Sequence, residues 1–205
     1  MPILLLTGFD VWPPHTSNPS WEAVAAASPQ VPPDWTVRKE KLPVSWRRGF
    51  DTLFNAWESD VGAVLAFGLA DVENIRVERT ARNNRTEGAK DVDDEPPEST
   101  VIAPSGPMEY GSGLPIDRIF NAFQEEGFPV EYSDSAGGFL CNYTFYSVMH
   151  KIAAENLQIP AEFIHVPHED QERGVDIPLL ARAVEIAAEL TLAQKDSPTD
   201  AEGAI

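Results

Sequence analysis

The chain has 205 residues, of which 42% are hydrophobic, enough to bury one sizeable core and close to the length of one typical domain. Its net charge of −18 argues against a nucleic-acid partner, because binding to a phosphate backbone needs clustered Lys and Arg. No stretch approaches the roughly 20 apolar residues that cross a bilayer, so we expect no membrane partner.

Apolar runs of strand length alternate along the chain with segments of helical period. In chain order, this pattern predicts strands at 3–7, 36–42, 63–67, 74–80, 130–133 and 162–166, and helices at 19–27, 46–57, 115–126, 142–156 and 177–193. Asn18 followed by Pro19 is a typical start for the first helix. The alternation is characteristic of α/β layer folds. We therefore predict a three-layer α/β/α sandwich in a single domain over residues 1–193.

Two segments depart from this alternation. Residues 82–113 are rich in Asp, Glu, Pro and Gly and show no period, which predicts a long loop of the kind that serves as a lid or binding element. The polar tail over 194–205 is predicted to be disordered. The opening "MPILLLTGFD" lacks a basic n-region and a cleavage site, so it predicts a buried strand rather than a signal peptide. One cysteine cannot form an internal disulfide, which favours a reducing compartment and a cytoplasmic location.

That cysteine, Cys141, follows a small-residue turn in "SDSAGGFLCNYTFY", at or beside the predicted start of the fourth helix. The free N–H groups and the positive dipole end of a helix start favour a thiolate, and the same amides can hold an oxyanion. Gly137 and Gly138 would let a carbonyl group approach the backbone closely. Cys141 is a candidate nucleophile, and the alternative is a structural thiol, since free Cys is among the most buried residue types.

A thiol nucleophile needs a base, and the base needs an orienting partner. Of the four histidines, His165 is the best placed, because "EFIHVP" puts it near the end of a predicted strand, where α/β sheets present functional groups. Glu73 and Glu78 are both candidate partners. Glu78 lies deeper in its predicted strand, where a carboxylate is costly to bury without a partner. The structural alternatives are a histidine bonded to a backbone carbonyl, and a surface ion pair of Glu78 with Arg76 or Arg79.

A zinc site built from Cys141, His165 and His168 is a further alternative. "HVPH" follows a strand and contains Pro167, so the two rings need not converge, and the paired cysteines of a structural zinc site are absent. We therefore predict no metal site.

Five motifs, in order along the chain, carry a resemblance to a known family: "LLTGFD" with "NPSWEA", "VERTA", "SGLPIDRI", "SDSAGGFLCNYTFY" and "FIHVPHEDQ". They resemble those of pyroglutamyl peptidase I (pyrrolidone-carboxylate peptidase), a family of cysteine peptidases that remove an N-terminal pyroglutamyl residue. The resemblance extends from the start of the chain to about Pro167. It implies Cys141 as nucleophile, His165 as general base and Glu78 as its orienting group. It also implies an α/β/α fold around a twisted mixed sheet of the phosphorylase/hydrolase-like type, no cofactor, and commonly a homotetramer.

The resemblance also places a pocket for the pyroglutamyl ring. Its wall candidates are Phe9 and Trp12 of the first loop and Phe139 and Leu140 of the cysteine motif. Such a pocket suits a flat, neutral lactam, whose methylenes can stack on aromatic faces while backbone groups bond its N–H and C=O. Asn18 matches a family residue near the ligand, and its alternative role is to cap the first helix.

Two departures from the family pattern bear on the substrate. Trp12-Pro13-Pro14 stands where the family usually has Phe and two glycines, which makes the pocket wall bulkier and stiffer. The loop after Glu78 is shortened and lacks an Arg-containing stretch, with Arg82 and Arg85 as candidate replacements. The predicted function is a cysteine exopeptidase that releases pyroglutamate from small peptides through a thioester acyl-enzyme. The alternatives are a related thiol amidohydrolase with a different N-acyl or cyclic-amide substrate, and a catalytically silent binding protein on the same fold.

Overall fold

The computed structural model describes residues 1–113, 116–170, 172 and 175–193, so the predicted tail over 194–205 lies outside the described residues. The strands are β1 (Ile3–Phe9), β2 (Thr36–Leu42), β3 (Val61–Leu69), β4 (Ile75–Glu78), β5 (Thr80–Arg82), β6 (Glu109–Gly111), β7 (Val130–Ser133) and β8 (Ala161–Val166). The helices are α1 (Pro19–Ala26), α2 (Trp46–Ala56), α3 (Ile116–Glu125), α4 (Leu140–Ala154) and α5 (Ile177–Ala193). In the described part of the chain, no helix has both the length and the apolar character of a membrane span.

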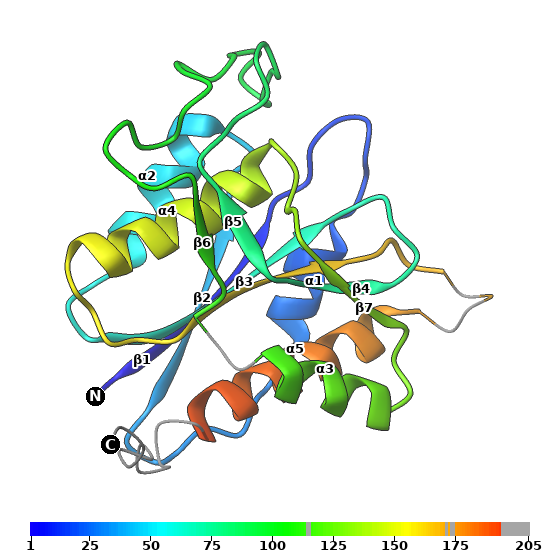
Figure 1. Cartoon of the computed structure of the whole chain (residues 1–205). Helices are drawn as coiled ribbons and strands as arrows, with labels where there is room; N and C mark the ends of the chain where they lie inside the picture. Colours follow the sequence, from blue (N-terminus) through cyan, green and yellow to red (C-terminus); the bar gives the residue numbers. More distant parts are fainter. Residues whose placement is uncertain (114–115, 171, 173–174, 194–205) are drawn as a thin grey trace, which may run out of the picture.

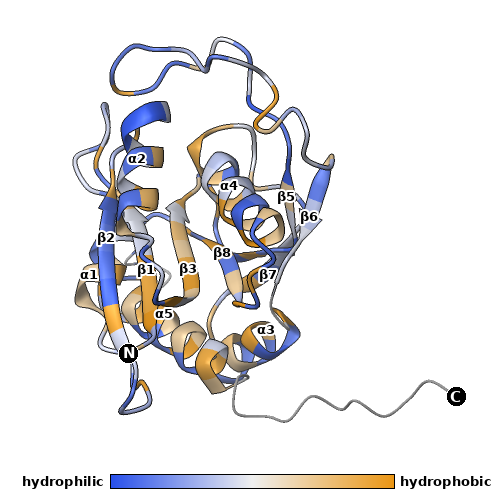
Figure 2. Cartoon of the chain, turned by 90° about the vertical axis from the view of Figure 1, so that its left-hand side faces the viewer, coloured by the Kyte–Doolittle hydropathy of each residue, from blue (hydrophilic) through white to orange (hydrophobic). Residues whose placement is uncertain are grey.

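A six-stranded sheet in the order β2-β1-β3-β8-β4-β7 forms the centre of the molecule (Figure 1). Parallel pairing joins β2, β1, β3 and β8, and also joins β4 to β7, whereas β4 runs antiparallel to β8. The sheet is therefore mixed, as the family resemblance implies. The central strands β1 and β3 are buried along their whole length, and β2 at the edge is mostly hydrophilic (Figure 2), as expected for a sheet whose middle is covered on both faces.

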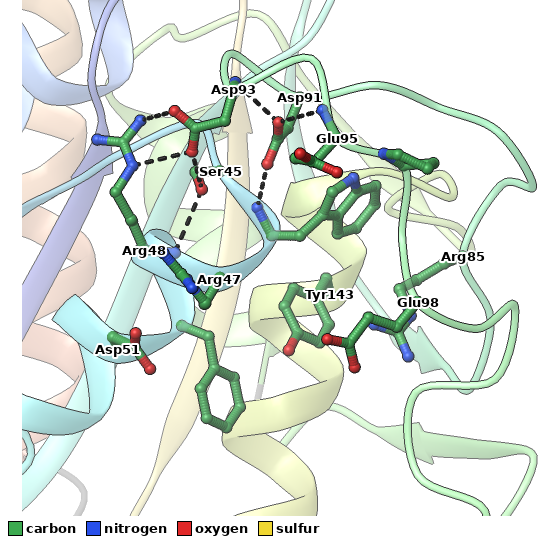
Figure 3. A pocket seen from close by; sticks show the side chains of 13 residues that line it. Ser45, Arg47, Arg48, Asp51, Arg85, Asp91, Asp93, Glu95, Glu98 and Tyr143 are labelled. Carbon is green, nitrogen blue, oxygen red and sulfur yellow. Dashed lines mark hydrogen bonds and ion pairs between the residues drawn. The ribbon is translucent and has the colours of Figure 1, made fainter.

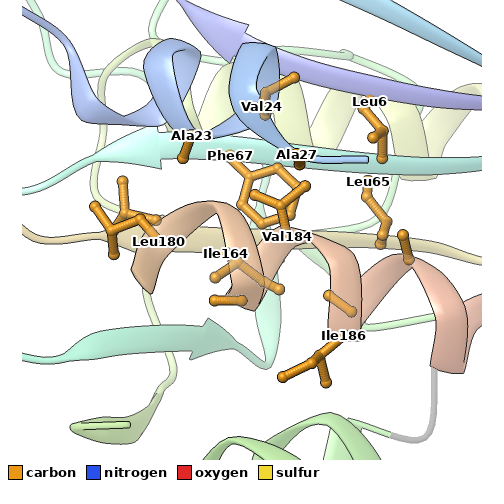
Figure 4. Packing of buried hydrophobic residues seen from close by; sticks show 14 of the residues in the cluster. Leu6, Ala23, Val24, Ala27, Leu65, Phe67, Ile164, Leu180, Val184 and Ile186 are labelled. Carbon is orange, nitrogen blue, oxygen red and sulfur yellow. The ribbon is translucent and has the colours of Figure 1, made fainter. Parts of the chain in front are cut away.

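Helices cover both faces of this sheet. On one face, α1, α3 and α5 pack through a hydrophobic cluster that includes Leu6, Val24 and Val184 (Figure 4). On the other face, α2 and α4 pack through a second cluster that includes Leu5 and Phe145. Leu5 and Leu6 serve different clusters because successive side chains of a strand point to opposite faces. The predicted three-layer α/β/α architecture is confirmed.

The segment predicted as one strand over 74–80 is in fact divided in two. β4 ends at Glu78, and Thr80 begins β5, which pairs with β6 in a separate two-stranded sheet. The chain turns at Arg79, whose N–H donates to the carbonyl of Ser133 (2.7 Å) and whose own carbonyl accepts from the N–H of Ser112 (2.9 Å). The prediction of a single strand was wrong, and Glu78 lies at the end of β4 rather than in mid-strand.

The segment over 82–113 is a loop for most of its length, as predicted, but side chains organise it. Buried Asn83 donates through Nδ2 to the carbonyl of Ala103 (2.8 Å), and its Oδ1 accepts the N–H groups of Ile102 (3.0 Å) and Ala103 (2.8 Å). The segment also contains β6, which the sequence analysis missed because Glu109–Gly111 has only three residues, too few to show a strand pattern.

Candidate active site

Cys141 is the second residue of α4 and lies in its first turn. The helix begins at Leu140, two residues before the predicted start at 142. Phe139 occupies the N-cap position with an extended backbone and makes no side-chain cap bond, so the first N–H groups of α4 lack the usual side-chain acceptor. Gly137 precedes them with φ +82, a conformation that glycine adopts without strain. The half-buried thiol of Cys141 therefore lies at a helix start whose amides remain open to an anionic group.

Strand β3 lies directly against this thiol. A Cβ atom on Gly68 would lie 2.8 Å from Sγ of Cys141 and 2.7 Å from Cζ of Phe163, closer than real Cβ contacts. Gly68 thus allows the start of α4 to approach the sheet. The sequence analysis missed Gly68, although a glycine inside an apolar strand is a recognised sign of close backbone approach.

His165 and Glu78 meet on the same face of the sheet as Cys141. Nδ1 of His165 lies 2.7 Å from Oε1 of Glu78, and the two residues are 5% and 0% exposed. They come from adjacent strands, since β8 pairs antiparallel with β4 in a register that puts Arg76 opposite His165. Gly68, which lies against Sγ of Cys141, pairs with His165 across β3 and β8, so the structure brings together the three residues that the sequence analysis selected for chemistry.

The ion-pair alternative for Glu78 does not hold. Nε of Arg76 pairs with Oε1 of Glu131 at 2.5 Å, and the guanidinium of Arg79 pairs with Asp134 at 2.6 Å. Both arginines therefore pair with other carboxylates, and Glu78 pairs with His165 instead.

The environment of His165 favours its protonated form. Burial by itself lowers the pKa of His165. The neighbouring Cys141 and the hydrogen-bonded Glu78 together raise it by a larger amount, so that the pKa is about 9 instead of 6.5. His165 thus carries a proton at neutral pH. The bond from Nδ1–H to Glu78 leaves Nε2 as the nitrogen that can exchange a proton with the thiol.

The four apolar pocket candidates share one hydrophobic cluster with the thiol. Phe9 and Leu140 are buried members of the cluster between the sheet and α2 and α4, and Trp12, Phe139 and Cys141 pack against it. The structure therefore gathers these candidates on the face of the sheet that carries Cys141.

Asn18 lies at the start of α1 and is buried. Its Oδ1 accepts from the N–H (3.1 Å) and the hydroxyl (2.8 Å) of Ser20, and its Nδ2 donates to the carbonyl of Asp10 (2.9 Å). The helix-cap interpretation is confirmed, and the same side chain closes the base of the loop between β1 and α1. A contact of Asn18 with a ligand stays a prediction.

The zinc set considered from the sequence is not assembled. The ring of His168 stacks on His15, with 5.4 Å between centroids. Within the described ranges, no group of three or more His, Cys, Asp or Glu side chains is arranged to hold a metal ion.

Asn142, next to Cys141, is a positioning residue that the sequence analysis missed. Its buried side chain accepts from the N–H of Arg82 (2.9 Å) and donates to the carbonyls of Arg82 and Asn84 (2.8 Å each). These bonds fix the first turn of α4 to β5.

Two arginines, Arg82 and Arg85, were predicted as replacements for a guanidinium of the family. Arg82 is exposed on β5, and the guanidinium of Arg85 lies over the ring of Tyr143, 5.1 Å from its centroid.

A separate pocket of about 610 Å³ lies between the start of α2 and the long loop (Figure 3). Asp93 accepts from the hydroxyl of Ser45 (2.7 Å) and from the guanidinium of Arg48 (2.5 Å), and the bond from Arg48 holds the pKa of Asp93 below its usual value. Asp91 accepts the N–H of Trp46 (2.8 Å). The loop therefore caps α2 here, and Cys141, His165 and Glu78 are not among the lining residues.

A thiol at an open helix start, backed by a buried imidazole with its own carboxylate, is the arrangement of a hydrolase that works through a thiol nucleophile. Comparison with known proteins narrows this class. A model of the pyroglutamyl peptidase family matches residues 2–191 of the chain. The chain belongs to that family, and it is a hydrolase of the thiol peptidase type.

Individual relatives of this family match the chain over nearly its whole length. The pyrrolidone-carboxylate peptidase of Bacillus subtilis is 32% identical over 208 residues, which cover 98% of this chain and 96% of that protein. The protein of that name from Clavibacter michiganensis is 34% identical over 194 residues, covering 93% and 90%. The crystal structure of Bacillus amyloliquefaciens pyroglutamyl peptidase I matches with a TM-score of 0.86 at 30% identity, over 97% of this chain and 100% of that one.

Proposed function

We propose that this chain hydrolyses the bond after an N-terminal pyroglutamyl residue in small peptides, with Cys141 as nucleophile, His165 as general base and acid, and Glu78 as the group that orients His165. The observation that carries the proposal is the 2.7 Å contact between the buried Nδ1 of His165 and Oε1 of Glu78, on the face that carries the thiol. Membership of the family supplies the substrate class.

The reaction follows from these positions. Cys141 has given its proton to Nε2 of His165, which holds it at neutral pH because its pKa is raised to about 9, and the thiolate sulfur attacks the acyl carbon of the pyroglutamyl group. The N–H groups in the first turn of α4 stabilise the oxyanion. His165 then gives its proton to the leaving amine as the C–N bond breaks, which leaves a thioester on Cys141. A water molecule, deprotonated by His165, cleaves the thioester and releases pyroglutamate, so each step uses only groups of the chain and water.

Phe9, Trp12, Phe139 and Leu140 form the walls of the acyl pocket in this proposal, with Asn18 at its edge. Its support is that the four apolar side chains belong to or pack against the same hydrophobic cluster as Cys141. A neutral lactam can stack there, whereas an open-chain glutamyl group would bring a charge into an apolar pocket.

Two further expectations belong to this proposal. The family resemblance implies a homo-oligomer, either a tetramer or a dimer, and light scattering on the purified chain tests it. The single free thiol suits the reducing conditions of the cytoplasm, and fractionation of the source cells tests that location.

The decisive test of the function is a panel of fluorogenic amides that carry pyroglutamyl, prolyl, glutamyl or N-acetylalanyl groups, assayed in reducing buffer with and without prior alkylation of the thiol. We expect release from the pyroglutamyl amide alone, and loss of that release after alkylation. Release only from another amide would favour the thiol amidohydrolase. No release from any amide, with slow alkylation of Cys141, would favour the silent binding protein.

A further inference from the structure

The loop between β1 and α1 holds Trp12 and His15 as one unit. The bond from Nδ2 of Asn18 to the carbonyl of Asp10 (2.9 Å) closes the base of this loop. Within it, the N–H of His15 donates to the carbonyl of Trp12 (2.9 Å), and the two rings lie 4.5 Å apart. A movement of His15 would therefore move Trp12.

The tip of the loop contacts a different part of the molecule through His15. Its imidazole stacks on that of His168, with 5.4 Å between centroids and 24° between planes. In the described part of the chain, no hydrogen bond from residues 11–17 reaches another element. The stack therefore joins the tip of this loop to the segment after β8.

The stack lies at the carboxyl end of β3, the strand that contacts the thiol. His15 follows β1 and His168 follows β8, and β3 lies between these two strands in the sheet. Gly68, the residue of β3 against which Sγ of Cys141 packs, lies near the same end of β3. His168 is also close in sequence to His165, so the stack joins the loop of Trp12 to the strand of the proposed base.

We propose that His15 and His168 are positioning residues for substrate binding: their stacked rings hold the loop of residues 10–18 over the end of β3, so that Trp12 presents a fixed wall to the acyl group. This proposal rests on the proposed function, in which Trp12 is a pocket wall. A wall already in place saves the cost of ordering the loop when substrate binds. Because Trp12 would contact the substrate before and during the reaction, loosening the loop raises KM and leaves kcat unchanged.

The first test compares His168→Ala, which removes the ring, with His168→Phe, which keeps a stacking ring. From the strength of aromatic pairs, we expect His168→Ala to raise KM for a pyroglutamyl amide about 2- to 12-fold at constant kcat, and His168→Phe to restore the wild-type KM. The control is His150→Ala, which removes a histidine ring that contacts Tyr146 (5.9 Å) and bonds to Tyr110 (2.9 Å) away from the loop of residues 10–18. An unchanged KM in His168→Ala, or no rescue by Phe, would overturn the proposal.

The second test needs no activity, so it separates this proposal from the proposed function. With four histidines in the chain, the imidazole proton resonances can be assigned by single substitutions. We expect nuclear Overhauser contacts between the rings of His15 and His168 in the wild type, and loss or broadening of the contacts of the Trp12 ring with the hydrophobic cluster in His168→Ala, while Trp12 and His15 stay in contact with each other. If the wild type cannot cleave the pyroglutamyl amide, the proposed function fails, and the stack is judged on these spectra. Contacts of Trp12 with the cluster that are unchanged in His168→Ala would refute it.

Discussion

Two glutamates on neighbouring strands are buried to nearly the same degree and have opposite chemical environments. Glu78 at the end of β4 is 0% exposed, and Glu162 in β8 is 2% exposed. Glu78 meets the imidazole of His165 on the face that carries α2 and α4. Glu162 alternates along β8 with Phe163 on that face and so lies on the other face with Ile164, and the hydroxyl of Ser112 and the N–H of Phe163 donate to its carboxyl group.

The partners decide what each carboxyl group does. Burial raises the pKa of Glu162 to about 8, the bonds from Ser112 and Phe163, which lower it, do not compensate, and the nearby charge of Glu78 also raises it. Glu162 therefore keeps its proton at neutral pH and is a neutral structural group. Glu78 faces His165, whose pKa of about 9 means that it carries a proton to share. A buried carboxyl group thus becomes useful for chemistry when its partner can take up charge, and stays neutral when its partners cannot.

Replacing Glu78 by Gln should have the largest effect. The substitution keeps the shape of the side chain but removes the charge that holds the proton on Nδ1 of His165, so we expect kcat to fall by about 10²- to 10⁴-fold. Steady-state kinetics on a pyroglutamyl amide would measure this, with circular dichroism as the check on folding. A folded variant with a kcat near that of the wild type would remove Glu78 from the mechanism.

Replacing Gly68 by Ala tests the region of Glu78 and His165 without changing a charge. The new methyl group would lie 2.8 Å from Sγ of Cys141 and would displace the thiol, so we expect kcat/KM to fall about 10- to 100-fold. Gly62→Ala is the matched control, because its methyl group would meet Trp35 at the same 2.8 Å near the other end of β3. Equal losses of activity in the two variants would contradict a specific role for the contact between Gly68 and the thiol.

The pH dependence of activity should report on His165. Above a pH of about 9, His165 loses the proton that it must give to the leaving amine, so kcat/KM should fall about tenfold per pH unit. The same decline should appear in Glu162→Gln, since the groups that raise the pKa of His165 are Cys141 and Glu78. An alkaline decline that moved to another pH in Glu162→Gln would show that Glu162 also sets the pKa of His165.

Replacing Glu162 by Gln should have the smallest effect on catalysis and instead change the pH dependence of stability. Because the pKa of Glu162 is raised from 4.5 to about 8 in the folded chain, its protonated form stabilises the fold below pH 4.5, and this stability is lost as the pH rises to about 8. Each tenfold difference in proton affinity between folded and unfolded chains is worth about 1.4 kcal/mol.

Gln cannot ionise, so the melting temperature of Glu162→Gln should exceed that of the wild type increasingly from pH 4.5 to about 8, with kcat unchanged. His165 contributes in both proteins, since its raised pKa stabilises the fold below pH 6.5 and that stability is lost towards about 9. If the melting temperatures of the two proteins differed by a constant amount from pH 4.5 to about 8, Glu162 would not be a buried neutral acid.

The sequence predicts the parts of the fold that depend on local pattern. The strand over Val130–Ser133 has the predicted bounds, and the helix over Ile177–Ala193 does as well, because each is a short-range apolar pattern. The pairing of Thr80–Arg82 with Glu109–Gly111 was not predictable in this way, since each segment has only three residues and they lie far apart in the chain.

The same division holds at the site. Cys141, His165 and Glu78 could be chosen from their chemistry and their places in predicted elements. The approach of the thiol to Gly68, and the stack of His15 on His168, depend on how distant segments pack, and no local pattern encodes them.

The central claim is that Cys141 carries the pyroglutamyl group during turnover, and trapping that intermediate tests it most directly. A pyroglutamyl nitrophenyl ester acylates faster than an amide, so the enzyme can be quenched in acid during turnover and analysed by mass spectrometry. We predict one added pyroglutamyl group on the peptide that contains Cys141, and neither adduct nor turnover in Cys141→Ala. Turnover by Cys141→Ala, or an adduct on another residue of the wild type, would contradict the account.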